Sequence, residues 1–195
     1  KCGSLGATVD ATGMGYAGSL GNQMFAVAAA VDKVSAIGGT VDVRAGLNNL
    51  SALLDRSGGA GVVVNVNASG MSHDELATVA TKIANVDALS SLTVSNAESV
   101  GELNTLLGAT NGALVSAGGM GTPKLNALVS NASHIAANGI TGTFTVLAGV
   151  TDVGALLGKC SVDAIVTVDA TSMTSGQLSA VNANMSKVDS LVNLS

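Results

Sequence analysis

The amino-acid sequence predicts an α/β fold, a right-handed βα solenoid in which parallel strands form one wall and helices cover one face of it. Three observations lead to this prediction. A turn-like phrase recurs along the chain, an apolar stripe with helical spacing follows it, and the segments before the turns alternate apolar and polar residues. Together they divide the 195 residues into about seven units of one repeat domain, residues 1–195.

Long and short units alternate strictly along the sequence. The four long units begin with residues 7–14, 64–71, 114–120 and 166–173, and the three short units span residues 40–54, 92–107 and 143–157. Self-similarity of this kind is typical of solenoids, in which each repeat packs only on its neighbours.

Apolar residues three and four positions apart predict a helix in every unit. Aligning the long units on Met71, Met120 and Met173 extends this stripe through Val86, Ile135 and Val188, and in the first long unit through Val34 and Ile37. Helix starts agree with the alignment. Residues 72–75 and 174–177 have the sequence of capping boxes, and Thr122 precedes Pro123, the expected first helical residue.

The strand-like segments share an apolar position, at Val9, Val41, Val66, Val94, Val115, Phe144 and Val168. Because strand side chains alternate, the two flanking positions face the other way. One flank reads Thr8, Thr40, Asn65, Thr93, Leu114, Thr143 and Thr167, and the other reads Asp10, Asp42, Asn67, Ser95, Ser116, Thr145 and Asp169. A doubly wound sheet buries both faces, so a polar face predicts helices on one side only.

These two polar rows, which exclude only Leu114, form the candidate binding face. Three interpretations are open: a solvated sheet face in which Thr serves β propensity, a surface for a glycan, a protein or another copy of the repeat, and, less favoured, an ice-binding lattice. The unit at residues 166–191 resembles units of long Ala/Ser/Val-rich tandem-repeat proteins of bacterial surfaces and bacteriophage virions. The architecture is leucine-rich-repeat-like, although that family's signature is absent. The resemblance implies a structural or adhesive role and transfers no site residue.

Gly13, Gly15 and Gly18 form a G-x-G-x-x-G pattern between a strand-like and a helix-like segment. In a dinucleotide site an acidic residue is expected about 20 positions further on, at the end of the second strand, but that strand ends at Arg44. The turn at Gly13 also aligns with those at Gly70, Gly119 and Ser172. We therefore interpret it as a repeat turn and predict no cofactor. An enzyme with a site in residues 13–24 is the disfavoured alternative.

Composition narrows the function classes further. A net charge of −5 with only 8 Lys and Arg argues against nucleic acid as a partner, and no apolar run is long enough for a membrane span. No metal-site or nucleophile-elbow spacing occurs. His73, Asp74 and Glu75 are expected to form an exposed first helical turn rather than a metal or acid–base site, and His134 is expected to be a surface or boundary residue.

Two questions stay open in the sequence. Cys2 and Cys160 are either two unrelated thiols or a disulfide. The chain stops as a next strand would begin and has no recognisable cap, which suggests a piece of a longer array, a self-associating subunit or a docked tail. The sequence thus predicts a non-enzymatic structural or adhesive module, extracellular, on a cell surface or on a virion, with protein partners. A ligand-binding repeat domain is the alternative.

Overall fold

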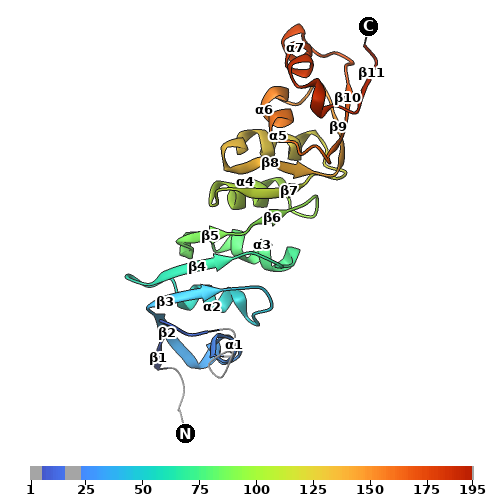
Figure 1. Ribbon diagram of the computed structural model, residues 1–195. Coiled ribbons are helices and arrows are strands. Elements are labelled where there is room, and N and C mark those ends of the chain that lie inside the picture. The colour runs from blue at the N-terminus through green and yellow to red at the C-terminus, as the bar shows by residue number, and fades with distance from the viewer. Residues whose placement is uncertain (1–5, 16–22, 195) are drawn as a thin grey trace. The chain divides into compact units, whose positions relative to one another are not determined.

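The computed structural model describes residues 6–15 and 23–194 (Figure 1). Within these residues the chain is a mixed α/β protein, with short parallel strands in four small sheets and seven short α-helices. Two compact units make up the chain, residues 1–90 and residues 91–195.

The first unit contains a two-stranded and a three-stranded sheet. Strand β1 (Ala7–Asp10) pairs with β2 (Val34–Gly38), and helix α1 (Gln23–Ala29) and the 3-10 helix η1 (Val31–Lys33) lie between them in sequence. The second sheet has the order β3-β4-β5. Its elements are β3 (Thr40–Val43), α2 (Leu50–Arg56), β4 (Val63–Asn67), α3 (His73–Thr81), η2 (Ile83–Asn85) and β5 (Ala88–Ser90).

The second unit repeats this arrangement twice. Its first sheet is formed by β6 (Thr93–Val94), β7 (Ala113–Ser116) and β8 (Ile135–Thr141), with α4 (Val100–Gly108), α5 (Thr122–Ser130) and η3 (Ala132–His134) between the strands. Its second sheet is formed by β9 (Thr143–Val146), β10 (Ile165–Asp169) and β11 (Ser190–Val192), with α6 (Val153–Gly158), α7 (Ser175–Ala183) and η4 (Met185–Lys187).

We call each set of three strands and two α-helices a module. A residue with positive φ precedes each of the three modules, and a fourth follows the last one: Gly39, Ser91, Gly142 and Asn193, separated by 52, 51 and 51 residues. At two of these positions the backbone carbonyl accepts a hydrogen bond from the second strand of the module that follows. The Val63 amide donates to Gly39 O and the Ile165 amide donates to Gly142 O, both at 3.0 Å.

Side chains from both the strands and the helices form the apolar core. Of the apolar strand positions predicted above, all except the half-buried Val9 are buried. The helices supply mainly leucine. In α4, for example, Leu103, Leu106 and Leu107 are fully buried. The structure thus confirms the predicted alternation of the strands and the apolar stripe of the helices.

The helix starts in the structure match those predicted from the sequence, except at α5. Ser72 and Thr174 form complete capping boxes with Glu75 and Gln177, and Ser99 forms a third with Glu102. The cap of α5 is Gly121 rather than Thr122, so Pro123 is the second helical residue. Proline remains suitable there because the first-turn amides lack helical acceptors.

The predicted helical stripe extends too far in every long unit. Val34 and Ile37 lie in strand β2, Ile135 begins β8, and Val86 and Val188 are extended residues that follow η2 and η4. The pairing register of β1 and β2 shifts between Ala7 and Thr8, and this irregularity lets both Val34 and Ile37 be buried. A spacing of three therefore occurs in an irregular strand as well as in a helix.

The strand register also differs from the sequence alignment. Val41 lies beside Val64 rather than Val66, and Phe144 lies beside Val166 rather than Val168. Val94 and Val115 are paired as aligned. The shift is by two residues, so the same side chains stay on the buried face, because a two-residue shift preserves the side-chain alternation.

Candidate functional site

None of the residues in the two polar rows is buried. Thr8, Asp10, Asp42, Thr93, Ser116, Thr143 and Thr145 are exposed, and Thr40, Asn65, Asn67, Ser95, Thr167 and Asp169 are half-buried. Leu114 interrupts the rows with 51% of its surface exposed. The polar strand face predicted from the sequence is therefore present in both compact units.

The strand pairing brings only some members of the rows together. Asp42 lies beside Asn65, and the Asn65 amide donates to Asp42 Oδ1 at 3.0 Å. Thr145 lies beside Thr167. Other members face residues outside the rows: Thr40 lies beside Val63, Thr93 beside Leu114, Ser116 beside Thr141 and Asp169 beside Val192.

Three row residues have a structural role at the end of a strand. A side-chain oxygen of Asp10, Asn67 or Asp169 accepts a hydrogen bond from the amide two residues further on, at 2.9–3.0 Å. Such Asx turns explain Asp and Asn at these positions without a ligand. The bonds from Thr12 lower the pKa of Asp10, and those from Asn193 and Thr171 lower the pKa of Asp169.

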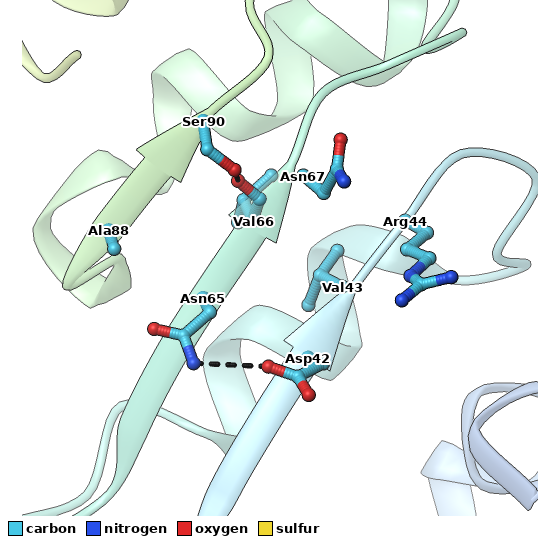
Figure 2. Close-up of a pocket in the computed structure, with 8 residues that line it drawn as sticks. All are labelled: Asp42, Val43, Arg44, Asn65, Val66, Asn67, Ala88 and Ser90. Carbon is cyan, nitrogen blue, oxygen red and sulfur yellow. Dashed lines mark hydrogen bonds between the residues drawn. The ribbon is translucent and has the colours of Figure 1, made fainter. Parts of the chain in front are cut away.

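The polar face of the β3-β4-β5 sheet contains a shallow pocket of about 310 Å³ (Figure 2). Its polar lining consists of Asp42, Arg44, Asn65, Asn67 and Ser90, and Val43, Val66 and Ala88 complete the lining. Figure 2 shows Asp42 and Asn65 pointing toward one another across β3 and β4, and Arg44 beyond the end of β3. The Ser90 hydroxyl donates to Val66 O at 3.3 Å.

This pocket presents amide, carboxylate and guanidinium groups to a polar ligand. Sequence reasoning singled out Asp42, Asn65 and Asn67 but missed Arg44 and Ser90 as parts of the same surface. Ser90 was missed because β5 was not expected. The alternation of Ala88, Leu89 and Ser90 was the available signal, since only Leu89 is buried.

The glycine-rich turn is one of four similar turns. In each, an alanine carbonyl accepts from the methionine amide three residues later, at Ala11–Met14, Ala68–Met71, Ala117–Met120 and Ala170–Met173. The third residue of each turn has positive φ: Gly13, Gly70, Gly119 and Ser172. Type II turns require this conformation. Gly13 thus lies in a recurrent turn, while Gly18 lies outside the described residues.

In the described part of the chain, neither of the two histidines nor Cys160 lies in a cluster of metal-binding side chains. His73 is exposed in the first turn of α3, and His134 Nδ1 lies 2.8 Å from Thr110 O. Burial raises the pKa of Cys160 to about 11, although Lys187 opposes this effect. Cys160 is a free thiol among the described residues, and Cys2, its possible disulfide partner, lies outside them. No His, Cys, Asp and Glu cluster suited to a metal ion occurs in residues 6–15 and 23–194.

In α3, α5 and α7 the third helical residue reaches back to an earlier loop. Glu75 accepts from the Gly46 amide at 2.6 Å, Lys124 donates to Asn96 Oδ1 at 3.0 Å, and Gln177 donates to Ala148 O at 2.8 Å. The Glu75 carboxylate also accepts from the Ser72 amide and hydroxyl. Each contact ties a helix start to the loop before the preceding α-helix and so stabilises the packing of the two helices.

Partial burial raises the pKa of Glu75, but the hydrogen bonds from Ser72 and Gly46 outweigh burial and leave the pKa below its usual 4.5. Its contribution to stability is therefore present above pH 4.5 and is lost as the pH falls through the lower folded-state pKa. We expect Glu75→Gln to remove this part of the pH dependence while keeping the capping box, as Gln177 does in α7. Glu75→Ala is expected to cost about 1 kcal/mol at pH 7.

Urea unfolding of the three proteins between pH 7 and pH 3 tests this expectation. Asp10 and Asp169 titrate equally in all of them, so only the difference between wild type and Glu75→Gln reports on Glu75. Parallel pH curves for these two proteins would show that the Glu75 contact contributes nothing.

Comparisons place the chain in no established group. No protein-family model matches it, and no curated protein and no solved structure shows significant similarity to it. Among the described helices, none combines the length and the apolarity needed to cross a bilayer.

Proposed function

We propose that this chain is a non-enzymatic structural or adhesive repeat module of a cell-surface or virion protein, folded as one right-handed βα solenoid. The observation that carries the proposal is the recurrence of the same module at intervals of 51 or 52 residues, each interval starting at a positive-φ residue. A protein built from repeats of one small unit gains length and surface area. An enzyme instead needs one site whose residues differ from those of the other repeats.

The size and chemistry of the modules support the same function. Each has three strands of two to seven residues and helices of six to nine residues, and a unit of this size buries so little surface that its own core is marginal. Stacking on a neighbour supplies the missing burial, which makes the number of modules adjustable. Thr, Asn, Asp and Ser on the outer face keep such an array soluble.

In-register removal of one period tests this proposal. We expect deletion of residues 92–142, which joins Ser91 to Thr143, to leave a folded protein with unchanged helical content per residue and a lower melting temperature. The control removes residues 92–129, which is not a whole number of periods and joins Ser91 to the last residue of α5, and it is expected not to fold. Circular dichroism and urea unfolding report the result. If both deletions abolish folding, the chain is not a modular array.

The second candidate is a ligand-binding repeat domain that uses the polar face, and the pocket on β3-β4-β5 specifically favours it. A glycan or a protein would bind there through Asn65, Asn67 and Arg44. Thermal-shift measurements with a panel of neutral and acidic oligosaccharides test this candidate. Stabilisation that is lost in the Asn65→Ala/Asn67→Ala double variant, but retained in Thr145→Ala on the other unit, would favour it over the structural function.

A further inference from the structure

The sequence contains two Asn-Gly pairs, Asn111-Gly112 and Asn138-Gly139. Glycine has no Cβ to hinder an approaching group, so its backbone nitrogen can attack the side chain of a preceding asparagine more easily than that of any other residue can. We propose that Asn111 is a site of spontaneous deamidation in the folded protein, whereas the fold protects Asn138. This modification does not depend on the proposed function.

The reaction needs only water as a co-reactant. The Gly112 backbone nitrogen forms a bond to Asn111 Cγ, the Cγ–Nδ2 bond breaks, and ammonia leaves with the proton that the Gly112 nitrogen gives up through water. The product is a succinimide ring. Water then adds to one of the two ring carbonyls and breaks its bond to the ring nitrogen. Opening at the side-chain carbonyl gives aspartate, and opening at the backbone carbonyl gives isoaspartate, in which the main chain runs through the side chain.

The surroundings of Asn111 leave both reacting groups accessible. Asn111 and Gly112 are exposed in the turn between α4 and β7. Among the described residues, no hydrogen bond involves the Asn111 side chain or the Gly112 amide. Gly112 has a φ of +77°, and apart from its chain neighbours no atom lies within 4 Å of the place that a Cβ would take. The peptide between the two residues can therefore rotate toward the side chain without losing a hydrogen bond.

Asn138 precedes the same residue type but has different surroundings. Its Oδ1 accepts a hydrogen bond from Lys187 Nζ at 2.9 Å, which holds the side chain in place. Gly139 is buried within β8, and a Cβ there would lie 2.9 Å from Ala136 O and 3.0 Å from Ala113 O. Because the backbone is packed so closely, the rotation that brings the Gly139 nitrogen onto Asn138 Cγ requires this part of the strand to open first.

The other two modules have an equivalent exposed turn that lacks the reactive pair. Ala60-Gly61 lies one repeat interval before Asn111-Gly112, and residues 162–163 lie one interval after it. Gly61 has a φ of +81°, and its surroundings are as open as those of Gly112. The turn of the first module therefore differs from the reactive one mainly in the missing asparagine side chain.

Peptide mapping by mass spectrometry, after the folded protein is kept at mildly alkaline pH, tests the proposal. Trypsin cleaves after Lys124 and so places the two asparagines in separate peptides. We expect the Asn111 peptide to gain the mass difference between water and ammonia and to divide into aspartate and isoaspartate forms, while the Asn138 peptide stays unchanged. In urea the fold no longer protects Asn138, and both peptides are expected to react at similar rates. Equal rates in the folded protein, or an Asn111 peptide that reacts only in urea, would overturn the proposal.

Ala60→Asn transplants the reactive pair to the turn of the first module. We expect the new pair to deamidate in the folded variant as Asn111-Gly112 does. Asn111→Gln is the matched control, because glutamine must close a larger and less favourable ring, and the peptide that carries it is expected to keep its mass. Circular dichroism establishes that both variants are folded. A folded Ala60→Asn variant whose new pair stays intact would show that accessibility of the turn does not cause the reaction.

Discussion

Replacing Leu106 with alanine is expected to lower the free energy of unfolding by about 2–5 kcal/mol, the range found for buried Leu→Ala changes. Leu106 lies in α4 with 0% of its surface exposed, between Leu103 and Leu107, which are equally buried. The chain has only 2% aromatic residues, so leucines supply most of the large side chains in the core. The loss includes a cost for the cavity that remains, because the surrounding structure relaxes only partly around the shorter side chain.

Urea unfolding followed by circular dichroism measures this effect. Leu114→Ala is the matched control, because Leu114 is 51% exposed on β7 in the same unit and its truncation is expected to cost less than about 1 kcal/mol. Equal losses for the two variants would mean that α4 does not pack as the structure has it.

Replacing Gly142 with alanine is expected to cost about 2–6 kcal/mol. Gly142 has a φ of +93°, where a residue with a side chain is strained by about 1–3 kcal/mol. An added Cβ would also lie 2.7 Å from the Gly118 amide nitrogen, and relieving such a contact by a backbone shift costs about another 1–3 kcal/mol. Gly142 is the break between β8 and β9, so the damage falls where one module meets the next.

Gly112→Ala separates the two parts of this cost. Gly112 has a φ of +77° but no atom within 4 Å of an added Cβ, so only the backbone strain applies, about 1–2 kcal/mol. The comparison uses the same urea unfolding. If Gly142→Ala lowers the free energy of unfolding no more than Gly112→Ala does, the close approach of Gly118 to Gly142 does not contribute to stability.

The candidate site was partly predictable. The alternation around Val66 placed Asn65 and Asn67 on one face, and the structure brings Asp42 next to Asn65. Ser90 joins the pocket only because residues 88–90 form a third strand, which depends on pairing with β4, 21 or more residues earlier. Asp10, Asn67 and Asp169 also have a structural role that the alternation did not predict. The side chain of each accepts a hydrogen bond in the turn that follows its strand.

The sequence by itself determined the features that depend on neighbouring residues: the recurrent turns, the capped helix starts at Ser72 and Thr174, and the alternation of the strands. Local hydrogen bonds and side-chain periodicity produce these features, and both can be read along the chain. Only the tertiary structure decided that Val34 and Ile37 belong to a strand, and that Val41 lies beside Val64. A spacing of three residues fits a helix and an irregular strand equally well, so pairing with a distant strand makes the choice. A register shift of two residues keeps every side chain on its face, so the hydrophobic pattern alone does not distinguish the two alignments.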